Sequence, residues 1–153
     1  MDLRATETIA APVADVWRIA SDTARYPEWI AGTLEVTRTD GPARLGSTYA
    51  EVNRVAGPIK GTSHWTVIEY DAPRRQVHRD ASIPFARYFD AIIETAEAGA
   101  GRTSFTLGIR GESRLGPIGA LVMRLLSGSL GKANRQNAAR FRQLVEREHR
   151  RPG

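Results

Sequence analysis

Residues 115–150 decide the fold, and they read LGPIGALVMRLLSGSLGKANRQNAARFRQLVEREHR. Pro117 suits the first turn of a helix, where its missing N–H is not needed. After it, apolar residues recur at helical spacing, first at positions 118, 121, 122, 125 and 126 and again at 133, 141, 144 and 145. This spacing predicts a long amphipathic helix. We expect it to cover the apolar face of a sheet formed by the residues before it.

The length of this helix predicts a bend. A straight helix over residues 117–149 would be about 50 Å long at 1.5 Å a residue, whereas a compact chain of this size is roughly 38 Å across. The apolar stripes of the two halves are also offset by roughly 80° at 100° a residue. Gly128, Ser129 and Gly131 lie between the halves. We predict a kink or break there, with the first half packed in the core and Asn137 facing the sheet.

Most of the chain before this helix reads as strands. Two short helices are predicted first, one beginning at Pro12 and one after Ser21-Asp22 that ends at Tyr26-Pro27. Short turns separate the strands, which suits antiparallel neighbours. Period-two patterning predicts seven strands, at 3–9, 34–39, 47–55, 60–70, 76–82, 87–96 and 103–110. We therefore expect an α+β fold, with a curved antiparallel sheet and one domain over residues 1–153.

The composition excludes several classes of protein. The chain is 41% apolar and 25% charged, which is typical of a globular domain. It has no cysteine, so disulfides, thiol catalysis and thiolate metal sites are excluded. The first residues lack the apolar core of a signal peptide, and no run is long enough to span a bilayer. We expect a cytoplasmic protein without stable membrane insertion, and the sequence leaves monomer or homodimer open.

The net charge of +5 lies at one end of the chain. From Lys132 onward there are seven Lys or Arg and two Glu, so residues 1–131 are neutral. The excess therefore belongs to the end of the long helix and to a basic stretch at 145–153 that can fray. Cations near a helix C-terminus are favourable without any partner. We interpret the excess as a solvated helix face and expect no nucleic acid partner.

No motif for metal or nucleophilic catalysis is present. The three histidines, His64, His78 and His149, are far apart, and none stands at helical ligand spacing from another His or Glu. There is no Gly-x-Ser-x-Gly elbow, and Gly99-Ala100-Gly101 reads as a hairpin turn rather than a phosphate loop. We expect neither a metal nor another cofactor.

The N-terminal region carries a family resemblance. Residues 9–17 (IAAPVADVW), Asp22 and residues 26–30 (YPEWI) resemble the signature of the SRPBCC superfamily, and within it the polyketide cyclase/dehydrase and lipid-transport group, relatives of START and pollen-allergen proteins. Residues 65–73 (WTVIEYDAP) and 101–103 (GRT) resemble a strand and the last hairpin of that group. The likeness covers the whole chain. It implies a helix-grip fold with a cavity for an apolar small molecule between sheet and helix, entered near the two short helices.

Polar residues at positions where the pattern expects apolar ones are candidates for the cavity. Asn137 lies in the helix stripe, and a buried amide needs partners. Arg79 follows Val77 on the face that we interpret as inward, where it would need a carboxylate or a ligand. If the parity of that strand is reversed, His78 and Asp80 point inward instead.

Two glutamates are candidate acids or bases. Glu51 alternates with Tyr49 and Asn53, and Glu7 lies between Ala5 and Ile9. Either carboxyl could have a raised pKa in an apolar pocket or pair with Arg79. Exposed glutamates are far commoner in strands, so both remain candidates only. Glu51 and Arg79 are the weak catalytic candidates.

The inward faces complete the predicted site. The resemblance favours Trp65 and Val67 inward, with His64 toward solvent. Periodicity places Phe105, Leu107 and Ile109 inward, and we choose Phe89 over Tyr88 for the strand at 87–96. The predicted ligand-binding residues are Tyr49, Glu51, Trp65, Arg79, Phe89, Phe105, Asn137 and Phe141.

Three functions fit these features. The first is a module that binds a small hydrophobic or aromatic molecule, such as a lipid, isoprenoid or polyketide-like compound. The second is a polyketide aromatase/cyclase or dehydratase-type enzyme that uses the same cavity and one acid or base. The third, which follows from the resemblance, is a ribosome- or quinone-binding module that uses the basic helix end. The sequence leaves it open whether the protein is an enzyme.

Overall fold

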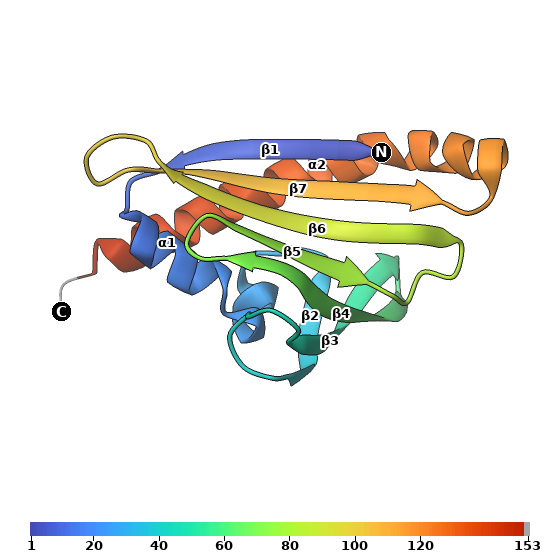
Figure 1. Cartoon of the computed structure of the whole chain (residues 1–153), viewed down its shortest axis with the longest axis horizontal. Helices are drawn as coiled ribbons and strands as arrows, with labels where there is room; N and C mark the ends of the chain where they lie inside the picture. The colour runs from blue at the N-terminus through green and yellow to red at the C-terminus, as the bar shows by residue number, and fades with distance from the viewer. Residues whose placement is uncertain (152–153) are drawn as a thin grey trace.

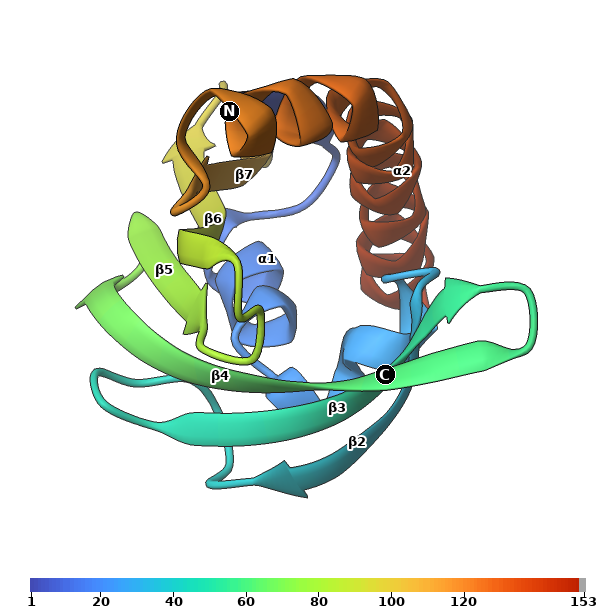
Figure 2. The ribbon, with the colours of Figure 1, turned by 90° about the vertical axis from the view of Figure 1, so that its right-hand side faces the viewer.

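The structure is a computed structural model that describes residues 1–151. A seven-stranded antiparallel sheet in the order β1-β7-β6-β5-β4-β3-β2 curves around one long helix, as Figures 1 and 2 show. The predicted helix-grip architecture is therefore confirmed. The elements are β1 (Asp2–Ile9), α1 (Val13–Ala20), η1 (Thr23–Glu28), β2 (Thr33–Thr39), β3 (Thr48–Ala56), β4 (Ile59–Asp71), β5 (Arg75–Asp80), β6 (Ala86–Glu97), β7 (Thr103–Ser113) and α2 (Gly116–His149).

The two short helices close one end of the sheet. Trp17 of α1 is buried and donates its indole N–H to the Tyr70 hydroxyl at 3.2 Å, which ties α1 to β4. The second helix, η1, is a 3-10 helix that runs through Pro27 to Glu28, so the predicted end at Tyr26-Pro27 is wrong. Proline lacks only the N–H group, and the carbonyl of Tyr26 still accepts hydrogen bonds from the backbone N–H groups of Trp29 and Ile30.

Helix α2 is continuous but bent. Its helical structure runs unbroken from Gly116 to His149, so the alternative of a break is wrong. Figure 2 shows its axis turning between the orange first part and the dark red second part, as a kink requires. The hydroxyls of Ser127 and Ser129 bond back to the carbonyls three residues earlier, at 2.6 and 3.1 Å, a bond type that bends helices.

The first half of α2 is not part of the core, contrary to the prediction. Only Gly119 and Met123 are buried between residues 116 and 130. Six apolar side chains around them are exposed, namely Leu115, Ile118, Leu121, Val122, Leu125 and Leu126. The second half packs on the sheet through Asn134, Ala138, Phe141, Leu144 and Val145. Asn134, not Asn137, therefore occupies the centre of the inner stripe, because the bend changes which residues face the sheet.

The C-terminal turn of α2 is held in place. Glu148 pairs with Arg25 of η1, and Arg25 also binds Glu28 at 2.6 Å. Residues 145–149 of the predicted basic tail are thus helical, and residues 152–153 lie outside the described residues.

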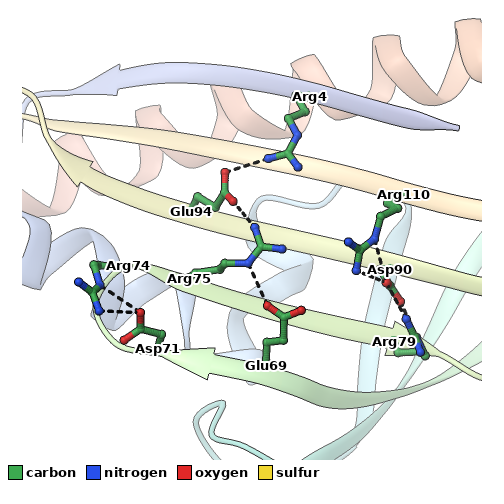
Figure 3. Close-up of polar contacts among 9 residues, drawn as sticks. All are labelled: Arg4, Glu69, Asp71, Arg74, Arg75, Arg79, Asp90, Glu94 and Arg110. Carbon is green, nitrogen blue, oxygen red and sulfur yellow. Dashed lines mark hydrogen bonds and ion pairs between the residues drawn. The ribbon is translucent and has the colours of Figure 1, made fainter.

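The outer face of the sheet carries ion pairs rather than a ligand site. Figure 3 shows one chain of charges from Arg4 through Glu94 and Arg75 to Glu69, which joins β1, β6, β5 and β4 across β7. Beside it, Asp90 lies between two arginines. These long charged side chains cover the outer face. The long helix α2 packs on the inner face.

Candidate functional site

A cavity of about 720 Å³ lies between the inner face of the sheet and α2. Because side chains alternate along a strand, each strand contributes every second residue to its wall. Aromatic and aliphatic groups make up much of that wall, among them Tyr26, Trp29, Tyr49, Trp65, Phe89, Ile93, Leu107 and Ile109. The inward placements predicted for Tyr49, Trp65, Phe89, Leu107 and Ile109 agree with the structure.

The cavity opens away from α1. Its exposed wall residues are Arg54, Val55 and Thr62 on β3 and β4, and Ser129 and Ala133 at the bend of α2. Tyr26 and Trp29, which come from the short-helix region, are buried in the wall. The opening therefore lies between the β3–β4 hairpin and the bend of α2, away from α1. The residues that directly follow η1 border it, because Gly32 accepts from the Arg54 N–H at 2.9 Å and the Ala31 N–H donates to Asn137 at 3.0 Å.

Glu51 is a buried carboxyl group with one oxygen atom that has no hydrogen-bond partner among the described residues. Its side chain reaches the cavity wall from β3 and is 5% exposed. Trp65 Nε1 donates to Glu51 Oε1 at 2.9 Å, and Oε2 has no hydrogen-bond partner among the described residues. Burial raises the pKa of Glu51, the Trp65 hydrogen bond offsets part of this effect, and the nearby charge of Asp80 adds to it. Glu51 can thus hold a proton more readily than an exposed glutamate.

Two further wall residues have unsatisfied polar atoms. Asn134 Nδ2 donates to the Leu107 carbonyl at 2.7 Å, while its Oδ1 atom is buried without a partner in the described chain. The same is true of Trp29 Nε1. With Glu51 Oε2, the cavity wall therefore carries one free donor and two free acceptors. Buried polar atoms are normally satisfied, so this group of three indicates a place for polar groups of a ligand or for water.

A hydrogen-bonded chain of neutral groups runs along the cavity wall into the core. Gln76 Nε2 donates to Ser21 Oγ at 3.1 Å, so the Gln76 oxygen faces His78 and accepts from Nε2–H at 2.8 Å. His78 Nδ1 is then free to accept from the Tyr49 hydroxyl at 2.7 Å. Burial lowers the pKa of His78 to about 4 and raises the pKa of Tyr49. Both groups are uncharged at neutral pH.

Arg79 does not face the cavity, and its predicted placement is wrong. Its guanidinium binds Asp90 at 2.7 and 2.9 Å on the outer face, and Arg110 binds the same carboxylate from the other side (Figure 3). The reversed parity holds instead, since His78 and Asp80 line the cavity. Burial raises the pKa of Asp90, but the hydrogen bonds from both arginines outweigh it and hold that pKa below its usual range.

Of the other candidates, three lie outside the cavity wall and one lies at its rim. Phe105 and Phe141 stack at 4.2 Å between ring centroids in the core and are absent from the cavity wall. Asn137 lies half-buried at the cavity rim, where its Oδ1 accepts from the Ala31 N–H at 3.0 Å. Glu7 binds Arg142 of α2 at 3.2 Å and lies outside the cavity.

Sequence reasoning missed Trp29 and Asn134 as cavity residues. Trp29 belongs to the resemblance motif at 26–30, and in the structure it both lines the cavity and packs, with its ring centroid 4.8 Å from that of Phe141. The predicted residue is Asn137, which lies three residues after Asn134. The spacing of Asn134 from Ala138 and Phe141, at four and seven residues, was the available signal.

The described residues limit other site types. Within residues 1–151 there is no group of three or more His, Cys, Asp or Glu side chains placed to hold a metal ion. Over the same residues, no helix is both long and apolar enough to cross a membrane.

Comparison with solved structures shows that the fold is shared. The Zhui aromatase/cyclase from Streptomyces sp. R1128 superposes with a TM-score of 0.81 at 18% identity, over 98% of this chain and 96% of that one. A START superfamily protein from Mycobacterium smegmatis gives 0.69 at 18% identity, over 94% and 98%. The di-domain aromatase/cyclase StfQ of the steffimycin pathway gives 0.75 at 12% identity, over 97% of this chain and 51% of that one.

Comparison of sequences places the chain in a family. A search of curated proteins returns no match. The sequence model described as polyketide cyclase / dehydrase and lipid transport matches residues 1–146, which is nearly the whole chain. This match shows that the chain belongs to the polyketide cyclase/dehydrase and lipid-transport family, and the shared helix-grip fold agrees with it.

Proposed function

We propose that the protein binds a small, mainly hydrophobic or aromatic molecule in the cavity between the sheet and α2. The observation that carries this proposal is the cavity of about 720 Å³, which is within the usual range for a small-molecule site. Its aromatic wall supplies contact area. Tyr49 and Trp65 lie nearly parallel, with ring centroids 6.2 Å apart, and give flat surfaces for a planar ligand.

The polar atoms of the wall specify the ligand further. Glu51 Oε2 and Asn134 Oδ1 favour hydroxyl or other N–H and O–H donors, and Trp29 Nε1 favours an acceptor. The charged side chains in the buried part of the wall are Glu51 and Asp80, both acidic, while Arg54 lies exposed at the opening. A free carboxylate or phosphate group would be repelled there. We infer a neutral, hydroxyl-bearing ligand rather than a fatty acid.

A matched set of probes tests this binding function. Isothermal titration calorimetry should detect 2-naphthol, whereas 2-naphthoate, which has a carboxylate in place of the hydroxyl, should bind at least about tenfold more weakly. Ala133→Trp narrows the opening from an exposed helix position and should weaken 2-naphthol binding. Lys132→Trp adds the same side chain outside the cavity wall and should leave binding unchanged. Equal losses in both variants, or no binding of either probe, would contradict the proposal.

A second candidate function is dehydration, favoured by the raised pKa of Glu51 and supported by the shared fold with two aromatase/cyclases. A protonated Glu51 can give its proton to a β-hydroxyl group that leaves as water. The carboxylate then takes a proton from the carbon next to the carbonyl, so Glu51 is regenerated and a conjugated ketone forms.

The two glutamates identified from the sequence give a matched test of this second function. With a naphthyl β-hydroxyketone as the probe, Glu51→Gln should reduce water elimination about a hundredfold. Glu7→Gln makes the same chemical change outside the cavity and should retain the rate. If the wild-type protein binds the probe without converting it, the binding function alone stands.

A further inference from the structure

The first half of α2 has an apolar face that the fold does not use. This face, which we call the α2 apolar face, consists of Leu115, Ile118, Leu121, Val122, Leu125 and Leu126, with exposed fractions from 41% to 74%. At 100° a residue these positions fall within an arc of about 140°, so they form one side of the helix. Gly119 and Met123, the buried residues of this half, lie outside this arc, about 90° and 130° from its centre, so the arc itself faces solvent.

The position of this half explains why nothing in the fold covers it. Figure 1 shows the orange part of α2 extending past the beginning of β1, and Figure 2 shows it crossing the top of the molecule before the bend. A contiguous exposed face of large aliphatic side chains on an otherwise ordinary globular chain marks an interaction surface.

The charges around the α2 apolar face select the kind of partner. Residues 113–145 contain six Arg or Lys and no Asp or Glu. Arg114, Arg124 and Lys132 are exposed, and none of them forms an ion pair in the part of the chain that the structure describes. An apolar helix face bordered by unpaired cations is the pattern of a helix that lies in the surface of an anionic membrane.

We propose that the α2 apolar face docks onto the surface of a bilayer that contains anionic lipids. The aliphatic side chains would enter the boundary between headgroups and acyl chains, and the arginines and lysine beside them would face the phosphates. A second copy of the chain is a poorer partner, because face-to-face pairing of two such helices brings like cations together and residues 113–145 contain no carboxylate to pair with them.

The α2 apolar face is continuous with the opening of the cavity. Ser129, Leu130 and Ala133 follow it directly along α2 and belong to the cavity wall. Docking would therefore turn the opening toward the lipid. The docking proposal itself does not depend on what the cavity binds, since it concerns the outer surface of the helix.

Vesicle flotation tests the proposal directly. The full chain should float with phosphatidylcholine vesicles that contain about one third phosphatidylglycerol, and at least about tenfold less with phosphatidylcholine alone. The double variant Ile118→Glu with Leu125→Glu should lose flotation. The control pair Leu45→Glu with Ala98→Glu makes the same change of charge at exposed positions in the loop before β3 and in the β6–β7 turn, and should reduce flotation far less. Circular dichroism checks that both variants fold.

Three results would overturn docking on anionic lipid. The wild-type protein would fail to float with the anionic vesicles, or the two double variants would lose flotation equally. In the third, the wild-type protein does not float but forms a dimer in analytical ultracentrifugation, and the double variant Ile118→Glu with Leu125→Glu is a monomer. That result would assign the face to a second copy instead. None of these results bears on probe binding in the cavity, so failure here is distinct from failure of the proposed function.

Discussion

Each face of the sheet has a buried carboxyl group, and only the one on the outer face is paired with cations. On the outer face, Asp90 is fully buried; its Oδ1 accepts a hydrogen bond from Arg79, and its Oδ2 accepts from both Arg79 and Arg110. On the inner face, Glu51 is almost as buried, yet it has one indole donor and no cation. The pKa of Asp90 is accordingly lowered and that of Glu51 raised. The outer face is organised for stability, whereas the inner face retains polar groups that folding alone does not satisfy.

The inner face also keeps His78 neutral, and this should lower the free energy of unfolding at acidic pH. The pKa of His78 is about 4 in the folded chain against an ordinary value of 6.5. As the pH falls, the unfolded chain binds a proton at His78 before the folded chain does. The contribution of neutral His78 to the free energy of unfolding is therefore complete above pH 6.5 and is lost as the pH falls toward 4. It amounts to about 3 kcal/mol of unfolding free energy. Urea unfolding across this range should show the loss in wild type and in His64→Gln, but not in His78→Gln. Equal behaviour of the two variants would contradict a neutral buried His78.

Removing the charge on the outer face should cost stability. Asp90→Asn leaves two arginines without their shared carboxylate, and both guanidinium groups keep partial access to water. We expect the free energy of unfolding to fall by about 2 kcal/mol, below the full cost of breaking a buried pair. Urea denaturation measures this. If the free energy of unfolding falls by less than about 0.5 kcal/mol, the ion pairs of Asp90 contribute no more to stability than exposed ion pairs do.

Removing the charge on the inner face should have the smallest effect and the opposite dependence on pH. Glu51→Gln should change stability by less than about 1 kcal/mol, since no cation loses its partner. The raised pKa means that Glu51 favours folding most below its ordinary value of 4.5, and that this advantage is lost as the pH rises. The lowered pKa of Asp90 gives the reverse, with a contribution present at neutral pH and lost in acid below 3.8. Parallel pH profiles for Glu51→Gln and Asp90→Asn would remove the distinction between the faces.

Much of the fold could be predicted from sequence because it follows from periodicity. Alternation gave all seven strands to within three residues, and apolar spacing gave α2. The predicted parity of β5 is wrong, because a hydrophobic pattern places the apolar Val77, and Arg79 with it, on the inner face. In the structure Val77 shares the outer face with Arg79, and the polar Gln76 and His78 satisfy each other inside. A hydrogen bond between inner side chains leaves no signature in a hydrophobic pattern.

The site was less predictable than the fold for related reasons. Asn134 and Asn137 lie close together on α2, and the bend at the serines decides which of them is buried. The apolar residues of the first half of α2 have the spacing of a core helix, although they are exposed. Periodicity shows that a helix has an apolar side, but it does not show whether that side meets the sheet or another surface.

Native mass spectrometry of gently purified protein tests the central claim, that the inner face is a ligand site, most directly. We predict a co-purified small molecule on the wild-type protein, retained in Lys132→Trp and lost or strongly reduced in Ala133→Trp. Its mass should fit a neutral, hydroxyl-bearing compound that the cavity of about 720 Å³ can hold. The account is contradicted if all three proteins carry the same adduct, or if the wild-type protein has no adduct and also fails to bind 2-naphthol.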